Sequence, residues 1–285
     1  MRTLLASAVL ATVALVVAAC DQPPAPPAPE PQKISAAPAP SNATPPALAA
    51  GTIGEAVNGA ALVKGDTIET SKGPLVVMPL NHASFLMSFG GKVIAVDPTM
   101  DAMKHGLLPK ADYVFVTHTH PDHFDKDALD AIGTKDTTYV GPQAVSALRP
   151  MTRTMANGEK QTFESFSVEA VPMYNLKRGP DAGLLFHDKG RGDGYVFTFG
   201  DKRIYVSGDT ECTPEMRALP NIDVAFMCMN LPYTMTPDEA ATCAKAFKPK
   251  VVYPYHYRGQ DPKTFAAALA GTGIDVRLRD WYAAP

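Results

Sequence analysis

Beyond residue 74, apolar residues occur in short runs that are separated by glycine, proline and polar turn residues. Runs of four to eight apolar and β-branched residues between turn signals are typical of β-strands. These runs predict strands at residues 75–80, 84–89, 93–96, 113–116, 138–140, 166–173, 195–198, 203–206, 223–229 and 251–253. Along the chain, a group of successive strands is followed by mixed strand–helix units, and this order then occurs a second time. This order fits two sheets packed face to face with helices outside.

Two helices are predicted, and the second has the strongest signals in the chain. The first covers residues 126–132, shortly after the strand at 113–116. The second begins after Thr236, where Pro237 takes the first helical position and Glu239 stands three residues after the cap. A threonine cap with glutamate at that spacing is a capping box, and proline is favoured at the first position. The start of this helix is therefore well defined by the sequence.

The N-terminus has the layout of a bacterial export signal. Arg2 precedes an apolar stretch at residues 4–17, and small residues lead up to Cys20. A charged start, a short apolar region and small residues before a cleavage point are typical of a secretory signal peptide. The Ala-Ala-Cys sequence resembles a lipobox, so residues 1–19 are predicted to be removed and Cys20 to be lipidated. The alternative is an ordinary signal peptide or a short anchor, although a spanning helix needs about 20 apolar residues.

Residues 20–52 are rich in proline and alanine and are predicted to be a linker. Such a composition buries too little apolar surface to repay ordering, and it favours extended conformations. The body, residues 53–285, is predicted to be one α/β domain. The lipid anchor would hold it on a membrane of the bacterial cell envelope, facing the periplasm. Asp21 resembles an inner-membrane retention signal and favours that membrane.

Charge and cysteine content narrow the class of protein further. The formal net charge of −3 and the absence of a basic run argue against a nucleic-acid partner. Three cysteines follow Cys20, namely Cys212, Cys228 and Cys243, and none forms a Cys-x-x-Cys pair. An odd number without that spacing argues against a disulfide scaffold. Cys228 and Cys243 lie in apolar segments and are interpreted as buried thiols rather than nucleophiles.

The segment from His118 to His123 carries the clearest chemical signal. Its sequence is His-Thr-His-Pro-Asp-His, and it follows the predicted strand at 113–116. Because alternate side chains of a strand point the same way, His118 and His120 can face one point. The turn that follows would present Asp122 and His123 to a second point. Imidazoles and carboxylates bind zinc and similar divalent ions, so the motif predicts a metal site rather than histidines that only cap the next helix.

Several motifs resemble the metallo-β-lactamase superfamily in residue type and chain order. These are Asp97 in Val-Asp-Pro, the histidine segment, Gly208-Asp209-Thr210 and the late His256. Residues 81–84, 235–237 and 249–256 also resemble its ascorbate-6-phosphate-lactonase-like branch. The resemblance covers the body from about residue 75 onward. It implies an αββα sandwich of two packed mixed β-sheets, with helices on the outer faces and metals at one edge between the sheets.

Position by position, the resemblance implies a set of metal ligands. It gives His118 and His120 to a first metal, and Asp122, His123 and His256 to a second. Asp209 would bridge the two ions, and Asp97 would lie behind a ligand imidazole and fix its orientation. Taken alone, Asp209 could be a turn residue and His256 a buried histidine. The implied cofactors are one or two divalent ions, zinc first, with manganese or iron as alternatives.

One departure concerns the third ligand of the first metal. The superfamily usually places a histidine after the strand that precedes Gly-Asp-Thr, and Asn175 stands there. Asparagine is a weak zinc ligand, and its carbonyl suits harder ions such as manganese. His187 could replace it by folding back, or could contact substrate. His82 also has two roles open, substrate contact or support of a ligand.

The segment at residues 176–194 is rich in glycine and basic residues. It leaves a strand that borders the first metal, so we expect it to overhang the cleft. Lys189 and its basic neighbours could bind an anionic group of the substrate there. The alternative is a solvated loop whose charges only aid solubility.

Three hypotheses for function follow from the resemblance. The first is a hydrolase in which a metal-bound hydroxide attacks a small, anionic ester, lactone, amide or phosphodiester, with Asp122 as the catalytic residue and Asp97 behind it. The second is a lipoprotein whose catalysis has lapsed and which binds only metal or a partner, supported by Asn175 alone. The third is a β-lactamase or a redox di-metal enzyme, although redox relatives usually carry glutamate in place of His120. The residues do not name the substrate.

Overall fold

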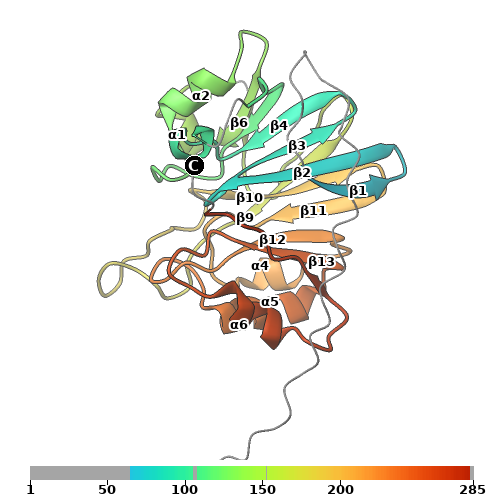
Figure 1. The fold of residues 1–285 in the computed structure, drawn as a ribbon. Coiled ribbons are helices and arrows are strands. Elements are labelled where there is room, and N and C mark those ends of the chain that lie inside the picture. The colour runs from blue at the N-terminus through green and yellow to red at the C-terminus, as the bar shows by residue number, and fades with distance from the viewer. Residues whose placement is uncertain (1–64, 105–107, 152, 283–285) are drawn as a thin grey trace, which may run out of the picture. The chain divides into compact units, whose positions relative to one another are not determined.

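Two mixed β-sheets form the centre of the computed structural model, which describes residues 65–104, 108–151 and 153–282 (Figure 1). Each sheet has seven strands, in the orders β1 to β7 and β14 to β8. The predicted signal peptide at residues 1–19 and the linker at 20–52 lie outside the described residues. Among the helices of the described residues, none has the length and apolar content needed to cross a bilayer.

The first sheet comes from the N-terminal half of the described chain. Its strands are β1 (Asp66–Thr70), β2 (Gly73–Asn81), β3 (Ser84–Phe89), β4 (Lys92–Val96), β5 (Tyr113–Phe115), β6 (Thr138–Pro142) and β7 (Arg153–Met155). Strands β1 to β4 pair antiparallel, and β4 to β7 pair parallel. Its helices are α1 (Met100–Met103), α2 (Lys126–Ile132) and α3 (Gln143–Ser146).

The second sheet repeats this design of an antiparallel half followed by a parallel half. Its strands are β8 (Lys160–Thr162), β9 (Ser167–Pro172), β10 (Asp193–Phe199), β11 (Lys202–Val206), β12 (Val224–Cys228), β13 (Val251–Tyr255) and β14 (Asp275–Val276). Strands β8 to β11 pair antiparallel, and β11 to β14 pair parallel. Its helices are α4 (Pro214–Arg217), α5 (Pro237–Phe247) and α6 (Pro262–Ala268), on the side away from α1 and α2 (Figure 1).

Both faces of the central strands are buried, which explains their continuous apolar runs. In β3, Phe85 and Met87 enter the core between the sheets, whereas Leu86 enters a second core with the helices of the first sheet. This alternation is the two-residue period of a strand. Between the sheets, the ring of Phe85 stacks on that of Phe226 with centroids 4.5 Å apart. The αββα class and every strand predicted from apolar runs are confirmed.

Helix α5 begins where the sequence predicts. Thr236 caps it by accepting from the backbone of Glu239, whose side chain accepts in return from the backbone of Thr236. The strands that the sequence did not predict are β1, β7, β8 and β14, which form the edges of the two sheets. An edge strand has one open side and fewer apolar contacts, so its residues carry a weaker apolar pattern.

The interpretation of Cys243 as a free thiol is wrong. Cys243 in α5 forms a disulfide with Cys212, and their Cα atoms are 5.6 Å apart. The loop after β11 folds back over α5 and brings together two residues that are 31 positions apart in sequence. Spacing along the chain could not show this contact. Cys228 is a buried free thiol, as predicted.

Candidate metal centre

The predicted ligands lie at the carboxyl ends of strands from both sheets. His82 follows β2, the segment from His118 follows β5, Asp209 follows β11 and His256 follows β13. These strands run in the same direction within each sheet, so their carboxyl ends reach a common edge. Binding sites in sheets with parallel strands form at such edges.

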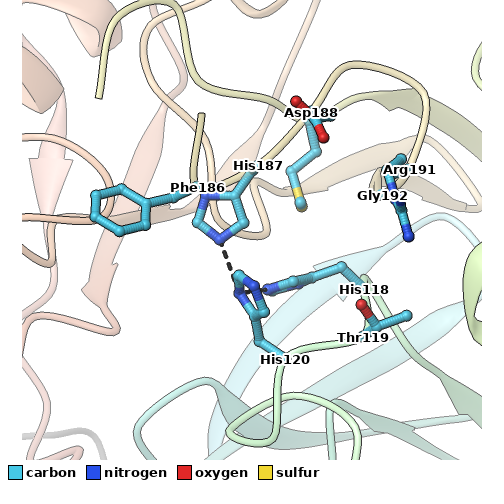
Figure 2. A pocket seen from close by; sticks show the side chains of 9 residues that line it. His118, Thr119, His120, Phe186, His187, Asp188, Arg191 and Gly192 are labelled. Atoms are coloured by element: carbon cyan, nitrogen blue, oxygen red, sulfur yellow. Dashed lines mark hydrogen bonds between the residues drawn. The ribbon is translucent and has the colours of Figure 1, made fainter. Parts of the chain in front are cut away.

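Three imidazoles form a first group at this edge. His118 Nε2 is 3.1 Å from His120 Nδ1, and His187 Nε2 is 3.1 Å from the same atom. Figure 2 shows the three rings pointing toward one another, with Phe186 on one side and Arg191 on the other. One ligand atom from each residue lies within 4.8 Å of the others, which suits one metal ion. The loop that carries His187 folds back over the predicted cluster.

A second group lies beside the first. His256 Nε2 is 3.0 Å from His123 Nε2 and 3.4 Å from Asp122 Oδ2. His82 Nε2 lies 3.0 Å from the same Asp122 oxygen. His82, Asp122 and His256 therefore form a set of ligand atoms within 4.8 Å of one another. The spacing again suits one metal ion.

Asp209 lies between the two groups. Its Oδ1 is 3.3 Å from the Nε2 atoms of both His123 and His256, and its Oδ2 is 3.5 Å from His187 Nε2. Oδ1 is buried and takes part in no hydrogen bond with the described residues. A buried carboxylate oxygen without a hydrogen bond is costly unless a cation faces it. The side chains therefore fit one or two divalent ions with a carboxylate between them.

The outer nitrogens of the ligand rings are held by hydrogen bonds. His123 Nδ1 donates to Asp97 Oδ2 over 2.7 Å, and the same carboxylate accepts from the Thr117 hydroxyl and backbone. Thr117 Oγ1 in turn lies 2.9 Å from His118 Nδ1. These contacts direct the Nε2 atoms inward, as partners of metal ligands do. Thr117 was not predicted, because a threonine beside a histidine motif carries no signal of its own.

Asn175 lies behind His187 rather than in the ligand group. His187 Nδ1 donates to Asn175 Oδ1 over 2.6 Å, and the backbone N–H of His187 donates to the same oxygen over 2.9 Å. The amide nitrogen of Asn175 donates to the carbonyl of Tyr233. The structure thus places His187 where the third imidazole is needed. The Asn175 side chain orients that imidazole.

His82 connects the second group to the C-terminus. Its Nδ1 is 2.8 Å from the hydroxyl of Tyr282, and its backbone N–H donates to the carbonyl of Trp281. The carbonyl of His82 accepts from the backbone of His256. The role of Tyr282 was missed, because it lies about 200 residues from His82 and in no recognisable motif.

Burial and charge set the protonation of the cluster. Burial lowers the pKa of His118 and His120, and it lowers the pKa of His187 to about 4. Burial also acts to lower the pKa of His123, but the carboxylates of Asp209 and Asp97 outweigh it and raise that pKa. A neutral imidazole is the form that binds metal. The first group is therefore ready for an ion at neutral pH.

Three site residues have left-handed backbone conformations. The φ angles are +56° for His82, +44° for Asp97 and +49° for His256. A side chain in this region is strained, at about 1–3 kcal/mol per residue. Each residue follows the last residue of a strand, so the unusual turn bends the chain directly at the metal edge.

The structure does not bring Lys189 to the metal cluster. Its Nζ pairs with Glu215 at 2.5 Å and lies 4.8 Å from the ring centre of Tyr174. The base of the 176–194 loop is held in a similar way, since Arg178 pairs with both Glu211 and Glu239.

Two cavities border the cluster and share His120 and Phe186. The smaller, about 160 Å³, lies beside the first group and includes Met173 and Arg191. The larger, about 600 Å³, includes Asp122, Asp209 and Arg258 and has space for a small molecule.

Comparison with known proteins agrees with this geometry. Residues 77–256 match the family model described as "Beta-lactamase superfamily domain". A UPF0173 metal-dependent hydrolase of Symbiobacterium thermophilum is 32% identical over 214 residues, which cover 68% of this chain and 91% of that protein. A second, from Anaeromyxobacter sp. (strain K), is 32% identical over 231 residues, which cover 73% of this chain and 82% of the relative.

Solved structures show the same architecture. A proposed metal-dependent hydrolase from Parabacteroides distasonis has 36% identity and a TM-score of 0.72, covering 76% of this chain and 98% of that one. A metallo hydrolase from Ignicoccus hospitalis, at 21% identity and a TM-score of 0.58, covers 72% and 94% and shows the fold alone.

Fold, ligand cluster and family match together define a metal-dependent hydrolase of the metallo-β-lactamase superfamily. Within that superfamily, the chain belongs to the UPF0173 metal-dependent hydrolase family.

Proposed function

We propose that this centre hydrolyses a small, anionic ester, lactone, amide or phosphodiester, and that zinc is the ion it binds. The single observation that carries the proposal is the position of Asp209. Its two oxygens face different groups of imidazoles, and Oδ1 lacks a hydrogen bond within the described chain. Divalent ions held there would supply a hydrolytic nucleophile at neutral pH and would polarise the substrate oxygen.

The side chains have separate roles in this proposal. The first group and Asp209 would hold one ion, and the second group and Asp209 the other. Asp97 and Asn175 fix the orientation of ligand rings by accepting their outer N–H groups. Asp122 is the partly exposed carboxylate of the larger cavity, where it would contact both ion and substrate. His82 holds that carboxylate in place by its contact with Oδ2.

The position of His187 argues against the hypothesis of lapsed catalysis. That hypothesis rested on Asn175 in place of a histidine, and His187 lies beside His118 and His120, where it would supply the third imidazole. We also propose that the chain belongs to the ascorbate-6-phosphate-lactonase-like branch, and the motifs at residues 81–84 and 235–237 support this. Phosphorylated lactones therefore belong among the substrates to be tested.

The test combines metal analysis with a substrate panel. The protein is loaded separately with zinc, manganese and iron(II), and bound metal is counted by elemental analysis after desalting. Loaded samples are then assayed with esters, lactones, amides, phosphodiesters and a β-lactam. We expect up to two ions per chain and turnover that chelation removes. Binding of metal without turnover on the panel would favour a binding protein, and no retained metal would exclude the metal centre.

We further propose that the protein is exported and anchored through lipid on Cys20, facing the periplasm of the bacterial envelope. Residues 1–19 have the layout of a lipoprotein signal. The Cys212–Cys243 disulfide supports export, because disulfides persist in oxidising compartments such as the bacterial periplasm. Cys20→Ala is expected to release a folded, soluble body from membranes. An unmodified Cys20 in membrane-extracted protein, detected by mass spectrometry, would disprove the anchor.

A further inference from the structure

An exposed arginine lines the larger cavity. Arg258 lines this cavity together with Asp122 and Asp209. Among the ion pairs of the described residues, none includes Arg258. By contrast, Lys177, Arg178 and Lys189 from the 176–194 loop are all paired with glutamates. Arg191 of the same loop lines the smaller cavity, and Arg258 is the arginine of the larger one.

The fold brings Arg258 to the cavity that borders the metal centre. It follows His256 by two residues, in the turn after β13 that carries this predicted ligand. Its guanidinium lies 5.6 Å from the ring centre of Tyr282, whose hydroxyl contacts His82. Cation–π contact of this kind holds a guanidinium over an aromatic face. The side chain is therefore placed by the same segments that place two site histidines.

Part of the wall of this cavity is apolar. Phe186, Leu231, Pro232 and Tyr233 line the same cavity. Phe186 and Tyr233 meet edge to face with ring centres 5.0 Å apart, and Tyr233 is 44% exposed. A cavity that combines a reactive centre, a cation and apolar wall residues suits a molecule with an apolar segment between two polar ends.

We propose that Arg258 binds an oxyanion at the end of the substrate remote from the scissile bond. The substrate class is an ester or lactone with a carboxylate or phosphate, separated from the reacting carbonyl by a short apolar chain. A guanidinium fork matches both oxyanions by paired hydrogen bonds. The inference rests on the hydrolase function proposed above, and it adds the feature of the substrate that the enzyme selects.

The experiment compares matched 4-nitrophenyl esters on the zinc-loaded enzyme. Succinyl, glutaryl and adipyl half-esters, and a 4-phosphonobutyryl ester, are compared with butanoyl, pentanoyl and hexanoyl esters. Wild type is expected to prefer at least one anionic ester by about 10-fold or more in kcat/KM. Arg258→Gln is expected to lower kcat/KM for that ester by about 10–100-fold, mainly through KM, and to leave neutral esters within about 2-fold. Arg258→Lys should restore part of the preference.

Two control variants localise the effect. Lys263→Gln removes a charge from an exposed position on α6, and Arg191→Gln removes one from the smaller cavity. Both are expected to keep the preference for the anionic ester. A loss of preference in either control equal to that in Arg258→Gln would overturn the proposal, as would equal rates for anionic and neutral esters in wild type. The carboxylate and phosphonate esters distinguish which oxyanion is selected.

A binding measurement separates this inference from the hydrolase function. Glutarate and pentanoate each offer one carboxylate to the metal centre, but only glutarate offers a second to Arg258. Calorimetry on zinc-loaded protein is expected to show glutarate binding about 10-fold more tightly, and Arg258→Gln is expected to abolish the difference. If glutarate binds more tightly through Arg258 but no ester is hydrolysed, the hydrolase proposal is wrong and the role of Arg258 in binding stands. Equal affinities in wild type would sink the role of Arg258.

Discussion

The two sheets supply the metal centre in different ways. The first contributes mainly a contiguous segment, His118 to His123, shortly beyond β5, together with His82 after β2. The second contributes single residues from separate places: Asp209 after β11, His256 after β13, and His187 from the loop between β9 and β10. A contiguous segment can be recognised as a metal motif from its spacing alone. Scattered residues acquire that meaning only when the fold brings them together.

The histidines from the two sheets are also held in place by different kinds of hydrogen-bond acceptor. His123 from the first sheet is held by the buried carboxylate of Asp97, which accepts three hydrogen bonds. His187 from the second half is held by Asn175, a neutral amide. A charged acceptor binds an N–H more strongly than a neutral one. We expect the first-sheet ligands to be the more rigid part of the site.

The largest loss of activity is expected from a substitution of Asp209, which lies between the two groups of imidazoles. Asp209→Asn keeps the size of the side chain but removes the charge that faces both groups of imidazoles. We expect activity to fall by on the order of 1,000-fold, as when a main electrostatic contact to the transition state is lost. Bound metal should also fall. Asp136→Asn, an exposed carboxylate of the first half, serves as the control. Full activity and metal content in Asp209→Asn would show that the two groups work independently.

A second prediction concerns Asp193, whose backbone N–H donates to Thr117 and so joins the two sheets at the site. Burial raises its pKa from 3.8 to about 7. The folded state therefore binds this proton more tightly than the unfolded state, and the free energy of unfolding falls as pH rises from about 4 to about 7. The loss is roughly 4 kcal/mol at most, at about 1.4 kcal/mol per pKa unit.

Denaturant unfolding at several pH values measures this effect. Asp193→Asn mimics the protonated acid and should flatten the curve between pH 4 and 7. The control is Asp201→Asn, in the exposed turn between β10 and β11, where hydrogen bonding by Lys202 lowers the pKa to about 2. Its slope between pH 4 and 7 should match wild type. An unchanged slope in Asp193→Asn would show that Asp193 stays ionised in the folded protein.

The third prediction concerns the disulfide, which lies in the second half of the chain. Cys212 lies three residues after Asp209, and Cys243 lies in α5. Reduction should lower the free energy of unfolding by about 3.7 kcal/mol, the chain-entropy value for a closed loop of this length. The body at residues 53–285, unfolded without reductant, should expose one reactive thiol, that of Cys228. Three reactive thiols would rule the bridge out.

The smallest effect compares the residues that orient ligand rings. Asp97→Asn and Asn175→Ala should each lower zinc affinity by about 10–100-fold, with the larger loss in Asp97→Asn. Competition with a chromophoric chelator measures both. Asn175→Asp keeps an oxygen acceptor for His187 and should bind zinc more tightly than Asn175→Ala. A larger loss in Asn175→Ala than in Asp97→Asn would reverse the proposed order of rigidity.

Sequence patterns predicted most of the fold because the central strands are buried on both faces. Their apolar runs are long enough to be recognised, and the capping box at Thr236 marked the start of α5 correctly. The short edge strands were not predicted. Each has one side open to solvent, so its residues show a weaker apolar pattern. The Cys212–Cys243 bridge was not predicted either, because the fold rather than the spacing brings its two thiols together.

For the site, candidate ligands at strand ends could be predicted from the sequence, but the residues that support them could not. His187 was left open between two roles, since nothing in a glycine-rich loop shows how far it folds back. Thr117 and Tyr282 were missed, because hydroxyl groups acquire a role only through the ring nitrogens they contact. Lys189 was expected to be a cation that binds substrate. It pairs instead with Glu215, which lies 26 residues away in sequence, so the pairing could not be predicted from the chain order.

The left-handed backbones at His82, Asp97 and His256 have a consequence for the evolution of this family. Glycine adopts that conformation without strain, so a glycine at these positions would relieve the backbone strain while removing a site residue. We expect selection for the metal centre to keep the strained residues in place. A relative freed from that selection should drift toward glycine at these three positions. Such glycines would mark inactive members of the family before any assay is run.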